Sequence, residues 1–263
     1  MGYGMKADHA QKSKLTHLPD VYFDVRQQSL NLVSGLTDAD ATVQSMPDAS
    51  PAKWHLAHTT WFFETLILLP KFGADSVFNP AFALLFNSYY ESLGARHPRA
   101  QRGMLTQPSL DQILSYRAHV DEAMDKLFRS DISAAEEALV ILGINHEQQH
   151  QELLLTDILH LFAQNPLYPA YKLPEPLVCD APVEQIQKMI AYDGGVVEIG
   201  YSGDSFTFDC EGPRHETLLR PYSLADRAVT NGEWISFIES GHHGVVNYLL
   251  TTRAYSYLIN LVI

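Results

Sequence analysis

The sequence predicts an α+β protein in which a four-helix bundle is followed by an incomplete mixed α/β domain. Apolar residues recur at helical spacing up to about residue 163, whereas from about residue 192 short β-type runs lie between Gly, Asp and Pro. The length of 263 residues is enough for two ordinary domains. With 46% hydrophobic and 19% charged residues, the composition is typical of a folded chain.

Two helices are expected before residue 71. Residues 20–36 carry apolar side chains at rough helical spacing, and Gly35 falls where a helix could end. Their apolar positions are Val21, Phe23, Val25, Leu30, Leu32 and Val33. The pattern restarts with Ser50 as N-cap and Pro51 at the first helical position, and an apolar run then continues to Pro70.

Two further helices are expected after a long connection. Residues 71–108 are rich in Gly, Pro, Asn and Arg, and compact domains usually keep so long an irregular segment for function. A capping-box spacing from Ser109 to Gln112 opens the third helix, whose apolar stripe is Ile113, Tyr116, Val120, Met124 and Leu127. A fourth helix runs from about residue 132 to about residue 163. Bundles of this kind build sites from inward-facing side chains.

The expected organisation has five segments: an N-terminal extension (1–17), the bundle (18–163), a Pro-rich linker (164–191), the start of the second domain (192–240) and a tail (241–263). A short helical piece is expected at residues 183–192. Strand-type runs cover residues 194–200, 205–209 and 217–226, and a helix capped at Thr230 or Asn231 follows them.

Charge and composition exclude several classes of partner. Eighteen basic against 31 acidic residues give a net charge of −13, which disfavours nucleic acid and anionic membrane surfaces. The two cysteines do not form a disulfide framework or a CxxC pair. The first residues have no apolar signal segment, so we expect a cytoplasmic protein. Twelve histidines are unusual, since histidine is the commonest metal ligand.

A pair of histidines on the fourth helix indicates a metal site. His146 and His150 are four residues apart, so their imidazoles lie one turn apart on one helical face. The pair sits amid a largely apolar helix, where polar groups need partners. The alternative is that both are ordinary polar residues on a solvated face.

The third ligand is expected on the second helix. His58 shares a stripe with Trp54, Trp61 and other apolar residues, whereas His55 projects roughly 100° from the centre of that stripe. We therefore choose His58 as a ligand and assign no metal role to His55. Three neutral imidazoles would leave positions on a metal open, as a catalytic site requires.

Two other classes of function compete. Read literally, the sequence HEQQH at residues 146–150 matches the zinc-protease motif HExxH, with Glu147 as general base. The residues that follow do not continue as a metzincin motif does. A non-catalytic bundle that binds a metal or a partner is the third possibility.

Several segments together resemble the ergothioneine-biosynthesis sulfoxide synthases, which are non-haem iron enzymes. Residues 45–64, 86–103 and 144–160 look like the DinB-like bundle of that family. Residues from about 192 resemble the start of its second domain, which is of the formylglycine-generating-enzyme type with a C-type-lectin-like fold. The resemblance covers roughly residues 18–240.

The resemblance implies a cofactor, substrates and site residues. It implies Fe(II) held by His58, His146 and His150, and O₂-dependent joining of a cysteine or γ-glutamylcysteine thiol to C2 of the hercynine imidazole. The arginines that contact the thiol substrate in the family correspond to Arg99 and Arg102, whose guanidinium groups suit carboxylates. Further matches are Gln149 near hercynine and Tyr90, or its neighbour Tyr89, as a donor of a proton or hydrogen atom.

The second domain departs from the family pattern. Cys210 stands where family members usually have Asn, and residues 241–243 stand where a Gly-Gly-Tyr usually begins. After that point nothing matches. The chain is therefore expected to be C-terminally truncated relative to the family, with a possible loss of activity.

Overall fold

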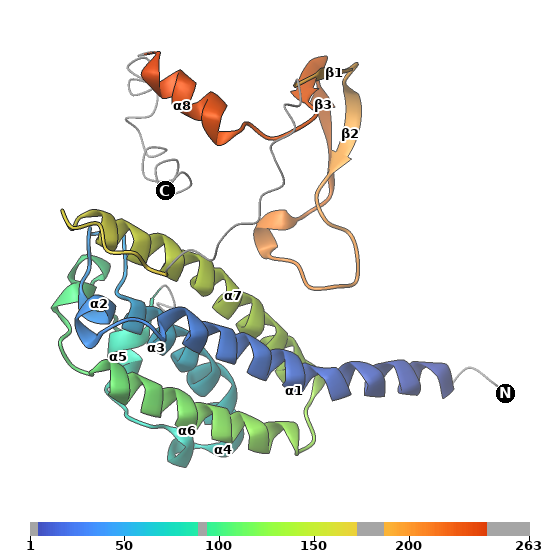
Figure 1. The fold of residues 1–263 in the computed structure, drawn as a ribbon. Coiled ribbons are helices and arrows are strands. Elements are labelled where there is room, and N and C mark those ends of the chain that lie inside the picture. Colours follow the sequence, from blue (N-terminus) through green and yellow to red (C-terminus); the bar gives the residue numbers. More distant parts are fainter. Residues whose placement is uncertain (1–4, 89–93, 173–186, 241–263) are drawn as a thin grey trace. The chain divides into compact units, whose positions relative to one another are not determined.

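The structure is a computed structural model that describes residues 5–88, 94–172 and 187–240, with the backbone alone for residues 5–16. The chain forms two compact units, Met1–Leu173 and Pro174–Ile263, which are described separately. The first unit is helical, and the second contains the strands (Figure 1).

The helical unit is a four-helix bundle. Its helices are α1 (Met5–Val33), α3 (Ala52–Phe63), α6 (Leu110–Phe128) and α7 (Ala134–Ala163). Helix α3 packs against α6 and α7, and α1 packs against the same two helices, which confirms the predicted bundle (Figure 1). Every residue of α3 is buried, because the other elements surround it on all sides.

The observed start of α1 and its buried face differ in part from the prediction. It begins well before residue 20, and its inward stripe includes Tyr22, Val25, Arg26 and Ser29. Phe23, which we assigned to the apolar stripe, is 37% exposed. Val25, Leu32 and Val33 are buried as predicted, whereas Phe23 was misplaced, because the buried face of α1 also carries the polar Arg26 and Ser29.

Helix α3 differs at both ends from the prediction. Pro51, not Ser50, is the N-cap, and the Ser50 backbone N–H donates to Asp157 at 2.8 Å. After α3 the chain continues through a π-helical turn (η1, Glu64–Leu68) into α4 (Leu69–Phe72). Pro70 does not end the helix, because it lies in the first turn of α4, where its missing N–H costs little.

Short elements interrupt the connection between α4 and α6. The segment before α3 holds α2 (Asp38–Thr42). The described part of the connection holds the 3₁₀ turns η2 (Ala74–Ser76) and η4 (Arg99–Met104), with α5 (Phe82–Phe86) between them. The predicted capping box of Ser109 and Gln112 opens α6, and all five predicted stripe residues are buried. Helix α7 has its own capping box of Ser133 and Glu136.

A buried ion network joins three helices of the bundle around Glu147. The Glu147 carboxylate accepts from Arg26 of α1 at 3.0 Å, from Arg117 of α6 at 2.8 Å and from Ser29 at 2.6 Å. Arg26 also donates to Asp121 at 2.7 Å. The side chains of Arg26, Arg117 and Glu147 are at most 2% exposed, so this network is part of the core.

Within residues 187–240, the strand-containing unit has two antiparallel strand pairs. Strand β2 (Gly195–Ile199) pairs with β3 (His215–Leu219), and β1 (Met189–Tyr192) pairs with β4 (Tyr222–Ala225). Thr230 caps α8 (Asn231–Glu239) as predicted. A mixed helix-and-strand composition after the bundle is therefore confirmed, while membership of the formylglycine-generating-enzyme type stays a prediction.

Two local predictions in this unit were wrong. Residues 189–192 form a strand rather than part of a helix, because they pair along their whole length with β4. Residues 205–209 form no strand, and a 3₁₀ turn (η5, Asp209–Glu211) begins there instead.

A glycine permits the close approach of α3 and α7. A Cβ atom on Gly143 would lie 2.5 Å from a ring carbon of Phe63 and 2.8 Å from one of Phe62. Gly143→Ala is therefore expected to destabilise the bundle by about 1–3 kcal/mol, despite the better helix propensity of Ala. Urea titration measures this cost, and Gly35→Ala is the control, because a Cβ on Gly35 meets nothing within 4 Å. Equal stabilities of the two variants would contradict the packing argument.

Candidate metal centre

The structure brings the three predicted histidines together. His58 lies on α3, and His146 and His150 lie one turn apart on α7. Each ring offers one nitrogen atom to the cluster, and these three nitrogen atoms all lie within 4.8 Å of one another. The ring centroids of His146 and His150 are 4.6 Å apart, and those of His58 and His150 are 4.8 Å apart. This is a distance at which three imidazoles can share one ion.

Hydrogen bonds leave a free nitrogen on two of these rings. Nδ1 of His58 contacts the Phe86 carbonyl oxygen at 2.6 Å and must be its donor, which makes Nε2 the free acceptor. Nδ1 of His150 contacts Nδ1 of His55 at 2.9 Å. Nδ1 of His146 is buried and has no hydrogen-bonding partner among the described residues. A buried polar nitrogen without a partner beside two other imidazoles fits a metal-binding role.

Aromatic stacking holds the His58 ring in place. It lies between Trp54, whose ring centroid is 4.6 Å away at an interplanar angle of 15°, and Trp61, at 5.7 Å and 13°. Since all three side chains belong to one helix at spacings of three and four residues, the stack follows from helical geometry. The stack restricts the rotation of His58.

The surroundings keep the three imidazoles neutral. Burial lowers the pKa of His58 well below its usual value, with a further contribution from His146. Burial lowers the pKa of His146 to about 4. Burial, and then the neighbours His55 and His58, lower the pKa of His150. Since only a neutral imidazole binds a metal, the three residues fit the ligand set of a divalent transition-metal ion.

These shifts predict an acid-sensitive fold. Between pH 6.5 and about 4, the unfolded chain binds a proton at His146 that the folded chain does not, so the free energy of unfolding falls as the pH falls through this window. Urea titrations of the metal-free chain across this range measure the slope. His146→Gln is expected to reduce that slope. A slope that is the same in both proteins would contradict the assignment.

Glu147 does not belong to the cluster. Burial by itself would raise the pKa of Glu147, but Arg117, Arg26 and Ser29 together lower it to about 2. Both of its oxygens are engaged by these partners, which belong to α1 and α6. A general base needs an oxygen that faces the metal and a pKa nearer neutrality. The geometry therefore disfavours the zinc-hydrolase alternative.

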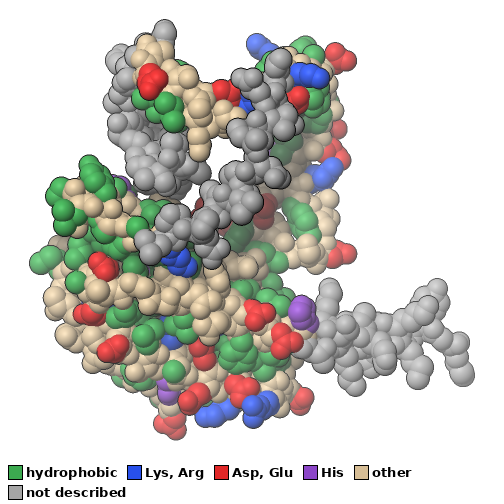
Figure 2. Space-filling view, viewed as in Figure 1, with side chains coloured by type: hydrophobic (Ala, Val, Ile, Leu, Met, Phe, Trp, Pro, Cys, Tyr) green, Lys and Arg blue, Asp and Glu red, His purple; other side chains and the backbone are tan. Residues whose placement is uncertain are grey.

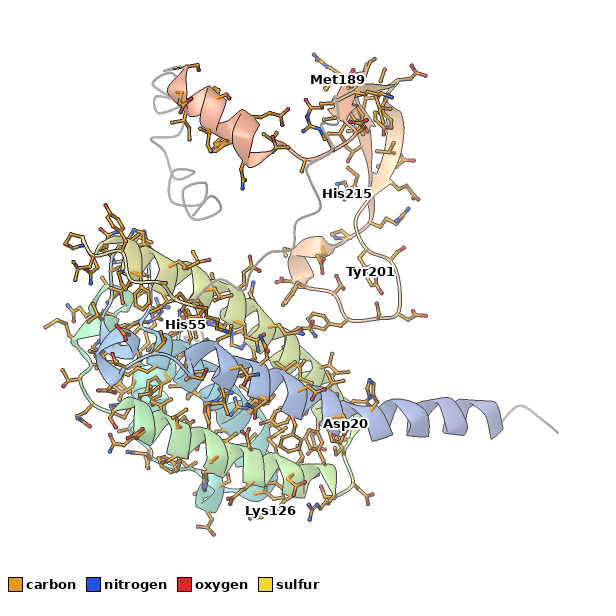
Figure 3. All side chains as sticks on the ribbon, viewed as in Figure 1. Asp20, His55, Lys126, Met189, Tyr201 and His215 are labelled. Carbon is orange, nitrogen blue, oxygen red and sulfur yellow. The ribbon has the colours of Figure 1, made fainter. Side chains whose placement is uncertain are left out.

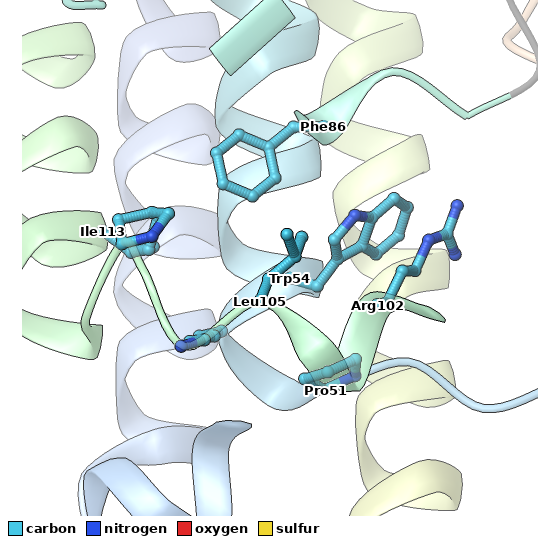
Figure 4. A pocket seen from close by; sticks show the side chains of 8 residues that line it. Pro51, Trp54, Phe86, Arg102, Leu105 and Ile113 are labelled. Carbon is cyan, nitrogen blue, oxygen red and sulfur yellow. The ribbon is translucent and has the colours of Figure 1, made fainter. Parts of the chain in front are cut away.

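The two predicted arginines lie in different surroundings. Arg102 is 5% exposed, and its guanidinium carbon lies 3.3 Å from the ring centroid of Trp54. It donates to Ser50 at 2.9 Å and to Ser88 at 3.2 Å. Figure 4 shows Arg102 beside Trp54 in a small pocket that Phe86 and Leu105 also line.

Arg102 therefore lies against one face of the Trp54 ring, and His58 stacks on the other. The positive charge of Arg102 also helps to lower the pKa of His58 and of His150. Arg99 is exposed and donates to the Asp48 backbone carbonyl.

The other predicted site residues are only partly placed. Gln149 is exposed on α7, one residue before His150. Tyr89 and Tyr90 lie outside the described residues.

Sequence reasoning missed His55 and Asp157, which contact each other at 3.0 Å beside His150. His55 lies inside the helical unit (Figure 3). The sequence did hold a signal for Asp157. It follows His150 by seven residues, which places it about two turns further along the same face of the helix.

The surface agrees with the acidic composition. In Figure 2, acidic side chains are spread over the visible face of the helical unit, and the few basic ones lie among them.

None of the helices in the described ranges is both long and apolar enough to cross a bilayer.

The bundle with its inward histidine cluster corresponds to a known class of domain. Residues 24–154 match the model of the DinB superfamily, so this part of the chain is a DinB-like domain. The chain is 29% identical over 224 residues to a hercynine oxygenase of Mycolicibacterium thermoresistibile, covering 83% of this chain and 47% of the relative.

A second relative, a hercynine oxygenase of Mycobacterium tuberculosis, is 28% identical over 218 residues, which cover 82% of this chain and 49% of the relative. These matches confirm the resemblance seen in the sequence. The chain spans about half the length of the relatives it matches.

Proposed function

We propose that the chain is an iron(II)- and O₂-dependent sulfoxide synthase that joins the thiol of cysteine or γ-glutamylcysteine to C2 of hercynine. The observation that carries the proposal is the cluster of three neutral histidines inside a DinB-type bundle. The names of the two relatives support hercynine as the substrate.

The proposed reaction balances with O₂ as the only oxidant. The C2–H bond of hercynine and the S–H bond of the thiol break, and a C–S bond forms. One oxygen atom of O₂ ends in the sulfoxide and the other leaves as water. Fe(II), when bound, supplies open coordination positions for the oxygen chemistry.

The protein's own residues have separate roles in this proposal. His58, His146 and His150 hold the iron. Arg102, fixed by Ser50 and Ser88, places a positive charge near the cluster and suits a substrate carboxylate. The remaining assignments are Arg99 as a second carboxylate contact, Gln149 as a hercynine contact, and Tyr90 or Tyr89 as the donor of a proton or hydrogen atom.

The test is O₂ uptake by the anaerobically purified chain loaded with Fe(II). Uptake is expected only when hercynine and one of the two thiols are both present, and mass spectrometry is expected to find the sulfoxide. His150→Ala, prepared in parallel, is the control and is expected to be inactive. Iron bound at the cluster without product would reject the enzyme and leave a metal-binding bundle.

A further inference from the structure

Behind His150, away from its free nitrogen, lies a second pair of polar side chains that the ligand set does not include. His55 is 4% exposed, and its Nδ1 lies 2.9 Å from Nδ1 of His150. Its Nε2 lies 3.0 Å from Oδ2 of Asp157, whose side chain is 13% exposed. The three residues therefore form a continuous chain from α7 to α3 and back to α7.

The direction of these hydrogen bonds follows from the Asp157 end. A carboxylate only accepts, so the His55 nitrogen that faces Asp157 carries a proton. The same Oδ2 also accepts the backbone N–H of Ser50 at 2.8 Å, which holds the carboxylate in position. In neutral His55 the other nitrogen, Nδ1, is then an acceptor. Its contact with His150 requires His150 to donate from Nδ1.

We propose that His55 and Asp157 are positioning residues that hold His150 in the tautomer with its proton on Nδ1. In that tautomer Nε2 carries the free lone pair and is the nitrogen available to a metal. The inference rests on the proposed iron site and deepens it. The Phe86 carbonyl oxygen does the same for His58, so two of the three ligands are oriented by a hydrogen bond at Nδ1.

The test compares two replacements of His55. His55→Leu has a similar volume and removes both hydrogen bonds. His55→Asn keeps an acceptor near the position of Nδ1 and loses the contact with Asp157. The matched control is His160→Gln, since His160 is a partly buried histidine of α7 that contacts Ser45 at 2.8 Å, outside the chain of three.

The first readout is the tautomer of His150 in the metal-free chain, measured by long-range ¹⁵N–¹H NMR and assigned with His150→Asn. A single Nδ1–H tautomer is expected in the unmodified chain and in His160→Gln. His55→Leu is expected to give a mixture or the Nε2–H form. An Nε2–H tautomer in the unmodified chain would overturn the proposal.

The second readout is the affinity for Fe(II), measured anaerobically against a chromophoric chelator. His55→Leu is expected to bind about 10–100-fold more weakly, as removal of such an outer partner does in other metal sites. His55→Asn is expected to recover part of this loss. Equal affinities of His55→Leu and the control would overturn the proposal. If the unmodified chain binds no Fe(II), the proposed function fails, while the NMR result still decides the role of His55.

Discussion

Glu147→Gln is expected to destabilise the helical bundle by about 3–5 kcal/mol, because it removes the carboxylate that pairs with the buried Arg117 and leaves Arg26 with Asp121 alone. Arg26 and Arg117 both reach Glu147, and neither side chain is more than 2% exposed. An uncompensated buried charge is among the few single changes that cost this much. Since domains are stable by only about 5–15 kcal/mol, much of the variant is expected to unfold in mild denaturant.

Urea titration followed by circular dichroism measures this effect. The matched control is Glu152→Gln, which removes an exposed carboxylate from the same helix. The zinc-hydrolase alternative predicts the opposite pattern, in which Glu147→Gln keeps the fold and loses only hydrolysis. A stable Glu147→Gln variant would therefore contradict the structural role assigned to Glu147.

Replacing His58, His146 or His150 by Ala is expected to lower the affinity for Fe(II). Each of these losses is expected to be larger than the loss caused by His55→Leu. Each variant loses a nitrogen that binds the ion, whereas His55 acts through His150. Anaerobic desalting followed by iron analysis is expected to find iron in the unmodified chain and in His160→Gln, but not in the three variants. Iron retained by all three would contradict the ligand assignment.

The bundle could be predicted because its signals are local. The capping box at Ser109 depends on residues three positions apart, and it begins α6 as expected. The separation of His146 and His150 is likewise fixed by one helix. His58 was chosen by its helical face, and the structure places it with the other two.

The features that sequence analysis missed depend on contacts between elements. His55 was set aside because it projects away from the stripe of His58, but α3 is buried all round, so its other faces also meet neighbours. Its contacts with His150 and Asp157 depend on the rotation of α3 against α7, which no spacing reveals. Residues 189–192 became a strand through pairing with β4, which lies some 30 residues further along the chain.

The most direct test of the metal centre is an anomalous-difference map from crystals of the chain grown anaerobically with Fe(II), with data collected at the iron absorption edge. A single strong peak bonded to nitrogens of His58, His146 and His150 is the expected result. His55 is expected to contact His150 without touching the ion. A peak held by other residues, or no peak at these three histidines under saturating iron, would contradict the account.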